Sequence, residues 1–214
     1  MAVRRRVGVL GGMGPEATVL FMQRVIERTE VTDDQDHVPL LVDSNPQVPS
    51  RVKAIVEGTG ADPGPVLVAM AHRLEAAGAE ALAMPCNTAH HFAPAITAAV
   101  KIPFLDMVAL SARRLADGGA RRIGVLASPA VRITGIFDRP LTELGLTPLY
   151  DHSDAATLAA IRAVKVRDYG PARQTLATAA AQFARAGADA LVVACTEFSI
   201  ITEAARNVLP LVDT

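Results

Sequence analysis

The chain is poor in cysteine and aromatic residues and carries almost no net charge. Its 214 residues include two cysteines and no tryptophan, 4% are aromatic, and the formal net charge is −1 at pH 7. A nearly neutral chain offers no electrostatic basis for binding nucleic acid or a membrane surface. No apolar stretch approaches the roughly 20 residues that a membrane-spanning helix needs. We therefore expect neither nucleic acid nor a membrane among its partners.

The start of the chain also lacks the pattern of a secretion signal. The basic run at 4–6 is followed by an apolar stretch that Gly11, Gly12, Gly14 and Pro15 cut short. Two cysteines without such a signal are typical of free thiols in a reducing compartment. The sequence therefore predicts a cytoplasmic location.

The hydrophobic pattern predicts an α/β fold. Short runs rich in Val, Ile, Leu and Ala alternate with longer amphipathic segments, which is typical of βα units around a parallel sheet. Strands are predicted at 6–10, 40–43, 81–84, 104–105, 123–126, 147–149, 190–194 and 211–212. Helices are predicted at 16–29, 65–77, 90–100, 108–117, 134–144, 154–164, 172–186 and 197–207.

An internal repeat divides the chain into two lobes. The segment Arg6–Leu10 matches Arg122–Leu126, and Ile102–Asp106 matches Leu209–Asp213. We therefore expect an N-terminal lobe at 1–105 and a C-terminal lobe at 106–214. Both would be βα lobes of similar topology.

Each copy of the repeat contains one cysteine at the same place. Cys86 lies in GAEALAMPCNTAHHF and Cys195 in GADALVVACTEFSII, each after a predicted strand and before a predicted helix. Ligand sites of parallel sheets lie beyond the carboxyl ends of the strands. Backbone N–H groups at a helix start favour a thiolate and can hold a carboxylate. Buried, inert cysteines are the plainer alternative.

Two matched thiols fit a reaction that works on both faces of one carbon. One thiolate can remove the α-proton of an amino acid while the other thiol delivers a proton to the opposite face. Such a pair must hold one thiolate and one thiol together, so its titrations are coupled. The chemistry needs no electron-sink cofactor if the site stabilises the carbanion electrostatically, and we expect no cofactor and no metal.

Four motifs in order resemble the aspartate/glutamate racemase family, and its aspartate racemase branch most closely. They are GGMGPEAT (11–18), SNPQVPSR (44–51), MPCNTAHHF (84–92) and ACTEFS (194–199), and the resemblance covers nearly the whole chain. It implies two pseudo-symmetric, Rossmann-like lobes with parallel sheets and an active-site cleft between them. It also implies racemisation of L- and D-aspartate without pyridoxal phosphate, and a homodimer. Cys86 and Cys195 match the two catalytic cysteines of the family.

The same resemblance implies which residues bind the substrate, a small dicarboxylic amino acid. Arg51 and Lys165 match groups that hold its side-chain carboxylate. The α-carboxylate would lie at two matching turns, and two further residues would line the site. In sequence order the set is Met13, Asn45, Arg51, Asn87, Thr88, Ala89, Lys165, Thr196 and Glu197.

Several other functions remain open. Residues 12–17 fit a dinucleotide-binding fingerprint, although Asp43 lies farther along than the ribose-binding acid of that motif. A metal site could use Cys86, His90, His91 and Cys195, although no close second ligand accompanies Cys195. Related folds could act on glutamate or hydantoins, isomerise maleate or decarboxylate arylmalonates. A catalytically silent amino-acid-binding protein is the alternative of a different class.

Overall fold

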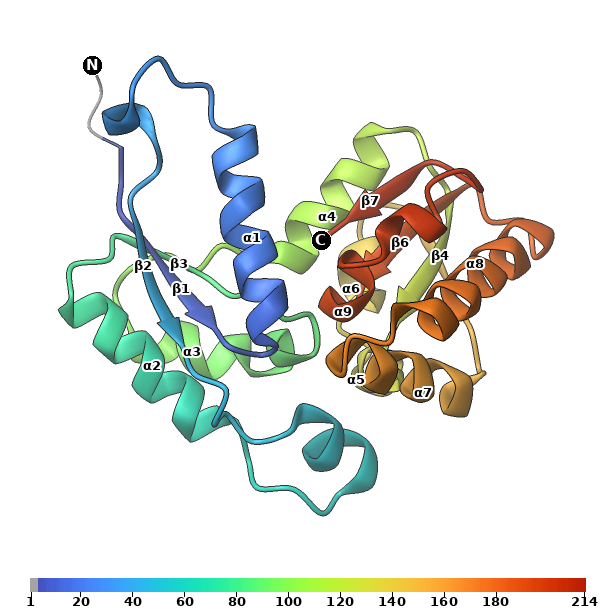
Figure 1. The fold of residues 1–214 in the computed structure, drawn as a ribbon, viewed down its shortest axis with the longest axis horizontal. Coiled ribbons are helices and arrows are strands. Elements are labelled where there is room, and N and C mark those ends of the chain that lie inside the picture. The colour runs from blue at the N-terminus through green and yellow to red at the C-terminus, as the bar shows by residue number, and fades with distance from the viewer. Residues whose placement is uncertain (1–3) are drawn as a thin grey trace. The chain divides into compact units, whose positions relative to one another are not determined.

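The computed structural model describes residues 4–214, which form two compact units. The N-terminal unit extends to Asp106, and the C-terminal unit is Met107–Thr214. Each unit is a parallel β-sheet flanked by helices, as the hydrophobic pattern predicted (Figure 1). Within the described residues, none of the helices is long and apolar enough to cross a membrane.

The sheet of the N-terminal unit has the strand order β2-β1-β3. Strand β1 (Val7–Gly11) pairs in parallel with β2 (Leu40–Ser44) and with β3 (Ala81–Ala83). The predicted strand at 104–105 is only an isolated bridge, in which Phe104 pairs with Leu82. The carboxyl ends of β1, β2 and β3 thus open onto the same edge of the sheet.

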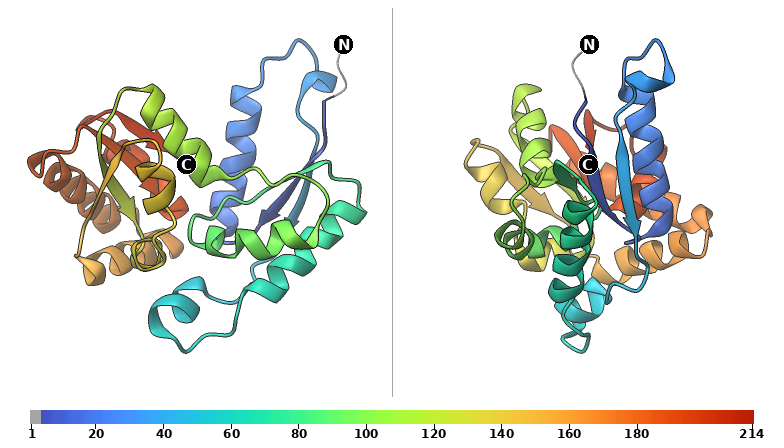
Figure 2. Two further views of the ribbon diagram at one scale, coloured as in Figure 1. Left: turned by 180° about the vertical axis from the view of Figure 1, so that it is seen from behind. Right: turned by 90° about the vertical axis from the view of Figure 1, so that its left-hand side faces the viewer.

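Helices lie on both faces of this sheet. Helix α1 (Pro15–Arg28) is on one side, and α2 (Gly64–Ala76) and α3 (Ala93–Ala99) are on the other (Figure 2). The main core of the unit lies under α2 and α3, where Leu10 and Leu82 are fully buried. Short helical turns occur at η1 (Asp34–Asp36), η2 (Lys53–Glu57) and η3 (Thr88–Phe92), of which η2 is a π-helix.

The C-terminal unit repeats this plan with a full fourth strand. Its strand order is β5-β4-β6-β7, and all the neighbours are parallel. The strands are β4 (Arg122–Ala127), β5 (Thr147–Tyr150), β6 (Ala190–Ala194) and β7 (Leu211–Asp213). Strand β6 is buried along its whole length, because helices cover both faces of the sheet.

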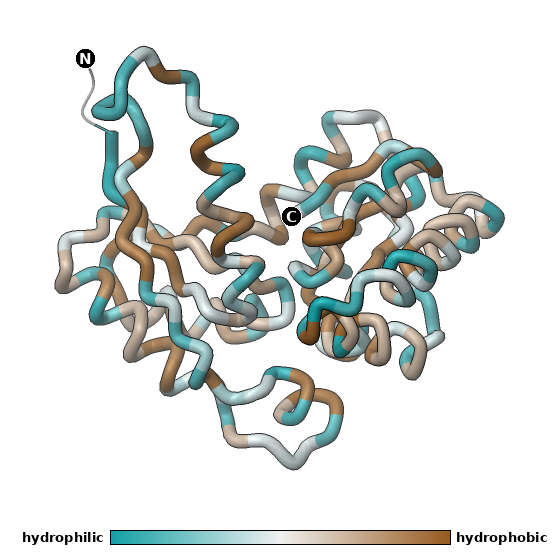
Figure 3. Tube along the Cα trace, viewed as in Figure 1, coloured by the Kyte–Doolittle hydropathy of each residue, from teal (hydrophilic) through white to brown (hydrophobic). Residues whose placement is uncertain are grey.

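Two separate cores stabilise the C-terminal unit. One face of the sheet packs against α7 (Asp154–Lys165) and α8 (Tyr169–Arg185). The other face packs against α4 (Met107–Asp117), α5 (Pro129–Thr134) and α6 (Asp138–Thr142). The strands of both units are mainly hydrophobic, as the brown colour along them shows (Figure 3).

Three predicted helices differ from the structure. The one predicted at 90–100 is divided between the 3₁₀ turn η3 and helix α3. The helix predicted at 134–144 was wrong as one element, because Gly135 adopts φ = 61° and separates α5 from α6. Such a left-handed glycine is a common way to end a helix. The helix predicted at 197–207 was too long. It consists of α9 (Thr196–Ser199) and the 3₁₀ turn η4 (Thr202–Ala204).

Candidate active site

The loop after β1 lies directly against the loop after β2. Gly12 has φ = 87°, and a Cβ atom there would come 2.4 Å from the backbone carbonyl carbon of Asn45. The Gly12 N–H donates to Thr18 Oγ1 at 2.8 Å, and the Asn45 N–H donates to the Gly11 carbonyl at 3.2 Å. Glycine at position 12 is therefore explained by the close approach of two loops, not by the dinucleotide fingerprint.

Arg51 reaches back to these loops. Its Nη1 donates to the carbonyls of Val48 (3.2 Å) and Pro49 (2.9 Å), and its Nη2 lies 3.5 Å from the carbonyl of Met13. Its Nε is buried without a hydrogen-bond partner, and Arg51 makes no ion pair within residues 4–214. The structure thus brings Arg51, Met13 and Asn45 together around an uncompensated positive charge.

Cys86 lies in the turn that follows β3. The side chain is buried, and the Cys86 N–H donates to the Met84 carbonyl at 2.8 Å. Asn87 comes next at the start of η3 and is also buried, as is Ala89, whereas Thr88 is partly exposed. The expected site residues of the N-terminal unit therefore lie beyond the carboxyl ends of its strands.

His90 holds the turn that carries Cys86. Its Nδ1 is 2.9 Å from the Cys86 carbonyl oxygen, and its ring lies 5.4 Å from the ring of Phe104. Burial lowers the pKa of His90, opposed by its bond to the Cys86 carbonyl and by the negative charge of Asp106. A neutral His90 is therefore a structural support for the turn. From the sequence, His90 was a possible metal ligand.

Cys195 is the first residue after β6 and the N-cap of α9. It is 5% exposed, and its Sγ lies 3.4 Å from Glu197 Oε2, so that the thiol can donate to the carboxylate. The other carboxylate oxygen, Oε1, lies 3.5 Å from Lys165 Nζ at the end of α7. Thr196 is buried beside them. Three expected site residues of this unit thus form one chain of contacts, from Lys165 through Glu197 to the thiol.

The pKa of Cys195 is raised well above its ordinary value, contrary to the effect expected from the helix start. Burial is the largest cause and the charge of Glu197 is the next. The backbone N–H groups of Phe198 and Glu197 do lower the pKa, but they are outweighed. Desolvation and a nearby carboxylate both penalise a thiolate. At neutral pH Cys195 is therefore a protonated thiol in this structure.

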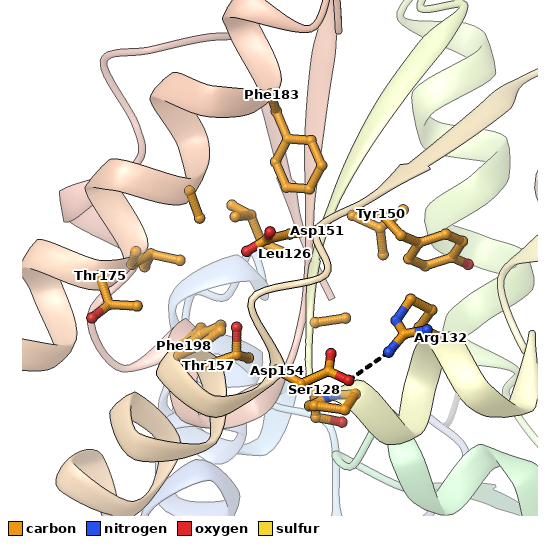
Figure 4. Close-up of a pocket in the computed structure, with 15 residues that line it drawn as sticks. Leu126, Ser128, Arg132, Tyr150, Asp151, Asp154, Thr157, Thr175, Phe183 and Phe198 are labelled. Atoms are coloured by element: carbon orange, nitrogen blue, oxygen red, sulfur yellow. Dashed lines mark hydrogen bonds and ion pairs between the residues drawn. The ribbon is translucent and has the colours of Figure 1, made fainter.

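A small pocket also lies in the C-terminal unit, between the carboxyl ends of β4 and β5 and helices α7 and α8 (Figure 4). Arg132 faces it, with its Nη2 2.6 Å from Asp154 Oδ2. Asp151 adds a second carboxylate to the lining. Because the guanidinium is already neutralised, the pocket offers no free positive charge to a carboxylate. Neither Cys195 nor Lys165 is among its lining residues.

Two of the alternative functions find little support in the described geometry. Asp43, the candidate ribose-binding acid, is 2.7 Å from Arg73 Nη2 and is held in that ion pair. Within either unit of residues 4–214, no group of three or more His, Cys, Asp or Glu side chains could hold a metal ion. Within the N-terminal unit, Cys86, His90 and His91 therefore do not form such a group.

The fold and the two thiol turns define a class of duplicated α/β proteins with one free cysteine at a strand end of each unit. The family model for Asp/Glu/hydantoin racemases matches residues 10–214, and the chain belongs to this family. Membership supports an isomerase.

Solved and curated relatives agree with this assignment. The structure is similar to Picrophilus torridus aspartate racemase, with 31% identity, a TM-score of 0.88 and coverage of 98% of this chain and 88% of that one. The chain is 24% identical to the broad-specificity amino-acid racemase RacX of Bacillus subtilis (strain 168), over 97% of this chain and 92% of that protein. Glutamate racemase from Francisella tularensis, in complex with D-glutamate, shares the fold at 17% identity and a TM-score of 0.66, covering 99% of this chain and 77% of that one.

Proposed function

We propose that this chain is an amino-acid racemase that interconverts L- and D-aspartate without pyridoxal phosphate. The observation that carries the proposal is the matched pair of buried free thiols, Cys86 and Cys195, each in the turn after a strand of its own unit. One thiolate removes the α-proton and the other thiol returns a proton to the opposite face. The similarity to an aspartate racemase at 31% identity supports this substrate.

The state of Cys195 suggests a direction for the resting enzyme in this proposal. Cys195 donates to Glu197 and is protonated at neutral pH, so it is the acid that delivers the proton. Cys86 is then the base for one enantiomer. For the other enantiomer, Cys195 must be the thiolate and Cys86 the thiol. Glu197 Oε2 at 3.4 Å is within reach to accept the Cys195 proton, and Cys86 must gain a proton. The two directions thus differ by one proton moved, in net terms, from Cys195 to Cys86.

The positive charges fit a dicarboxylic substrate. Arg51 makes no ion pair in the described chain, so its guanidinium is available to the distal carboxylate. Lys165 is already paired with Glu197, which makes it a weaker partner for that carboxylate than the sequence suggested. Asn87, Thr88 and Thr196 would hold the α-carboxylate at the two turns. Guanidinium groups bind carboxylates through charge-assisted hydrogen bonds, often in bidentate geometry.

Incubation of the reduced protein in D₂O tests the function directly. We expect L-aspartate to yield D-aspartate that carries deuterium at the α-carbon, as chiral separation and mass analysis would show. L-glutamate and several neutral amino acids complete the panel, because one curated relative is a broad-specificity racemase. No D-isomer and no exchange with any substrate would contradict the proposal. Racemisation of neutral amino acids as fast as aspartate would contradict the substrate class.

Arg51→Ala should weaken the binding of aspartate by about 10–100-fold, because a hydrogen bond to a charged group contributes roughly 1.5–3 kcal/mol. A neutral amino acid should lose less than about twofold. Steady-state KM values for both substrates measure the difference. Arg73→Ala is the matched control, since Arg73 is already paired with Asp43 in the same unit. Equal losses for both substrates in Arg51→Ala would remove Arg51 from substrate recognition.

A further inference from the structure

Asp213 ties together the segment that follows Cys195. Its Oδ1 accepts a hydrogen bond from Ser199 Oγ at 2.5 Å, and its Oδ2 accepts one from Thr202 Oγ1 at 3.0 Å. Ser199 is 6% exposed and Thr202 is 2% exposed. Ser199 is the last residue of α9 and Thr202 is the first residue of η4. A single carboxylate therefore holds both short helices.

The same contacts fix the position of Cys195. The Ser199 N–H donates to the Cys195 carbonyl at 3.1 Å, which closes the turn that begins at the thiol. Asp213 is itself held on β7, where it is opposite Val193 of β6. Thr214 Oγ1 donates to the Val193 carbonyl at 3.0 Å. The thiol turn is thus anchored to the strand beside it, through Asp213, and not only by its own short helix.

The N-terminal unit has a similar arrangement with different side chains. His90 lies four residues after Cys86, as Ser199 lies four residues after Cys195. Asp106 closes the segment 102–106, which repeats the segment that ends at Asp213. His90 Nδ1 meets the Cys86 carbonyl at 2.9 Å, and the charge of Asp106 acts on His90. The aspartate that ends the repeat thus acts on the fourth residue after the cysteine in both units, through a hydrogen bond in the C-terminal unit and through its charge in the N-terminal unit.

We propose that Asp213 is the positioning residue of Cys195, which it orients through Ser199 and Thr202 without touching substrate. The catalytic consequence rests on the proposed function. A general acid or base must lie in line with the Cα–H bond, and a displacement of about 1 Å can cost about 10²-fold in rate. A helix of four residues has too few internal hydrogen bonds to supply that precision. The buried carboxylate on the neighbouring strand supplies it instead.

The test compares Asp213→Ala with Asp189→Ala. Asp189 also accepts two close hydrogen bonds, from the backbone N–H groups of Arg121 (3.0 Å) and Arg122 (3.1 Å), but at the amino end of β4. The first measurement is the alkylation rate of each cysteine with iodoacetamide, followed by peptide mass spectrometry. It needs no substrate. The second is kcat and KM for aspartate racemisation.

In Asp213→Ala we expect Cys195 to be alkylated about tenfold faster, because the turn loses two hydrogen bonds to a charged group, and Cys86 to be unchanged. The kcat should fall by about 10²-fold, with KM within about threefold because Asp213 binds no substrate. Asp189→Ala should leave the ratio of the two alkylation rates unchanged. The proposal would be overturned if both cysteines in Asp213→Ala were alkylated faster by the same factor. It would also be overturned if Asp189→Ala changed the ratio of the two alkylation rates as much as Asp213→Ala does.

Ser199→Ala keeps the proposal testable if Asp213→Ala does not fold. This variant removes one of the two hydrogen bonds, so a smaller change confined to Cys195 is expected. An unchanged Cys195 in folded Ser199→Ala would overturn the positioning role. If the wild-type protein racemises no amino acid but the alkylation pattern is as expected, the proposed function fails and the positioning role stands. If the wild-type protein racemises aspartate but the alkylation rate of Cys195 is unchanged in Asp213→Ala, the proposed function stands and the positioning role fails.

Discussion

Racemisation of aspartate is expected to fall by about 10²–10⁴-fold when either Cys86 or Cys195 is replaced by alanine, the range that general acid–base groups contribute. In the proposed mechanism each thiol serves one face of the α-carbon, so neither can substitute for the other. Both cysteine side chains are about 5% exposed, so replacement by the smaller alanine should cost a modest amount of stability. The fold should nevertheless persist. Circular dichroism would verify this.

Exchange of the α-proton in D₂O separates the roles of the two thiols. The variant that keeps Cys195 should still exchange the α-proton of the enantiomer that Cys195 serves, slowly and with retention of configuration. The variant that keeps Cys86 should do so with the opposite enantiomer. The two variants are therefore controls for each other. Racemisation at the wild-type rate in either variant would exclude the two-thiol mechanism.

Replacing Glu197 with glutamine should lower the pKa of Cys195. The Glu197 carboxylate lies 3.4 Å from Sγ, and its negative charge disfavours a thiolate. The amide of glutamine removes the charge while preserving the shape of the side chain. The pH at which Cys195 becomes reactive to iodoacetamide should therefore fall. It should stay above that of a free thiol, because burial is the larger cause of the shift.

Two further variants check the sign of this effect. Lys165→Met leaves the Glu197 charge less compensated, so it should move the alkylation midpoint of Cys195 in the opposite direction, towards higher pH. The change should be smaller, because the Lys165 side chain is 50% exposed and solvent screens its charge. Glu203→Gln is the matched control, since Glu203 pairs with Arg173 in the same unit. A midpoint that does not move in Glu197→Gln would remove Glu197 from the control of thiol acidity.

Much of this architecture could be read from the sequence because its signals are local. Apolar runs of four or five residues define the strands, and the repeated cysteine segments place each thiol after a strand. The family resemblance, which the family model confirms, supplied the expected neighbours. The structure gathers Met13, Asn45 and Arg51 in one unit, and Lys165, Thr196 and Glu197 in the other.

What the sequence did not predict depends on contacts between distant segments. The raised pKa of Cys195 follows from burial and from the Glu197 charge, which outweigh the helix N–H groups that the local pattern emphasises. The hydrogen bonds that Asp213 accepts from Ser199 and Thr202 join residues 14 and 11 positions apart in the sequence. The sequence showed the repeat that ends at Asp106 and Asp213, but not which side chains these aspartates contact. Only the pairing of β7 with β6 shows what the second aspartate can reach.

The ion pair at the end of α7 makes the acidity of a buried thiol responsive to events at the protein surface. Lys165 is half exposed, whereas the carboxylate that it partly neutralises is 14% exposed and borders Cys195. A rise in ionic strength screens the charge of the exposed Lys165 more than that of the less exposed Glu197, because mobile ions shield charges over about 8 Å at physiological salt. The neutralisation of Glu197 by Lys165 is thereby weakened. Glu197 then acts more strongly on the thiol, which becomes a weaker acid. Salt concentration and small shifts of α7 are thereby converted into a change of proton affinity.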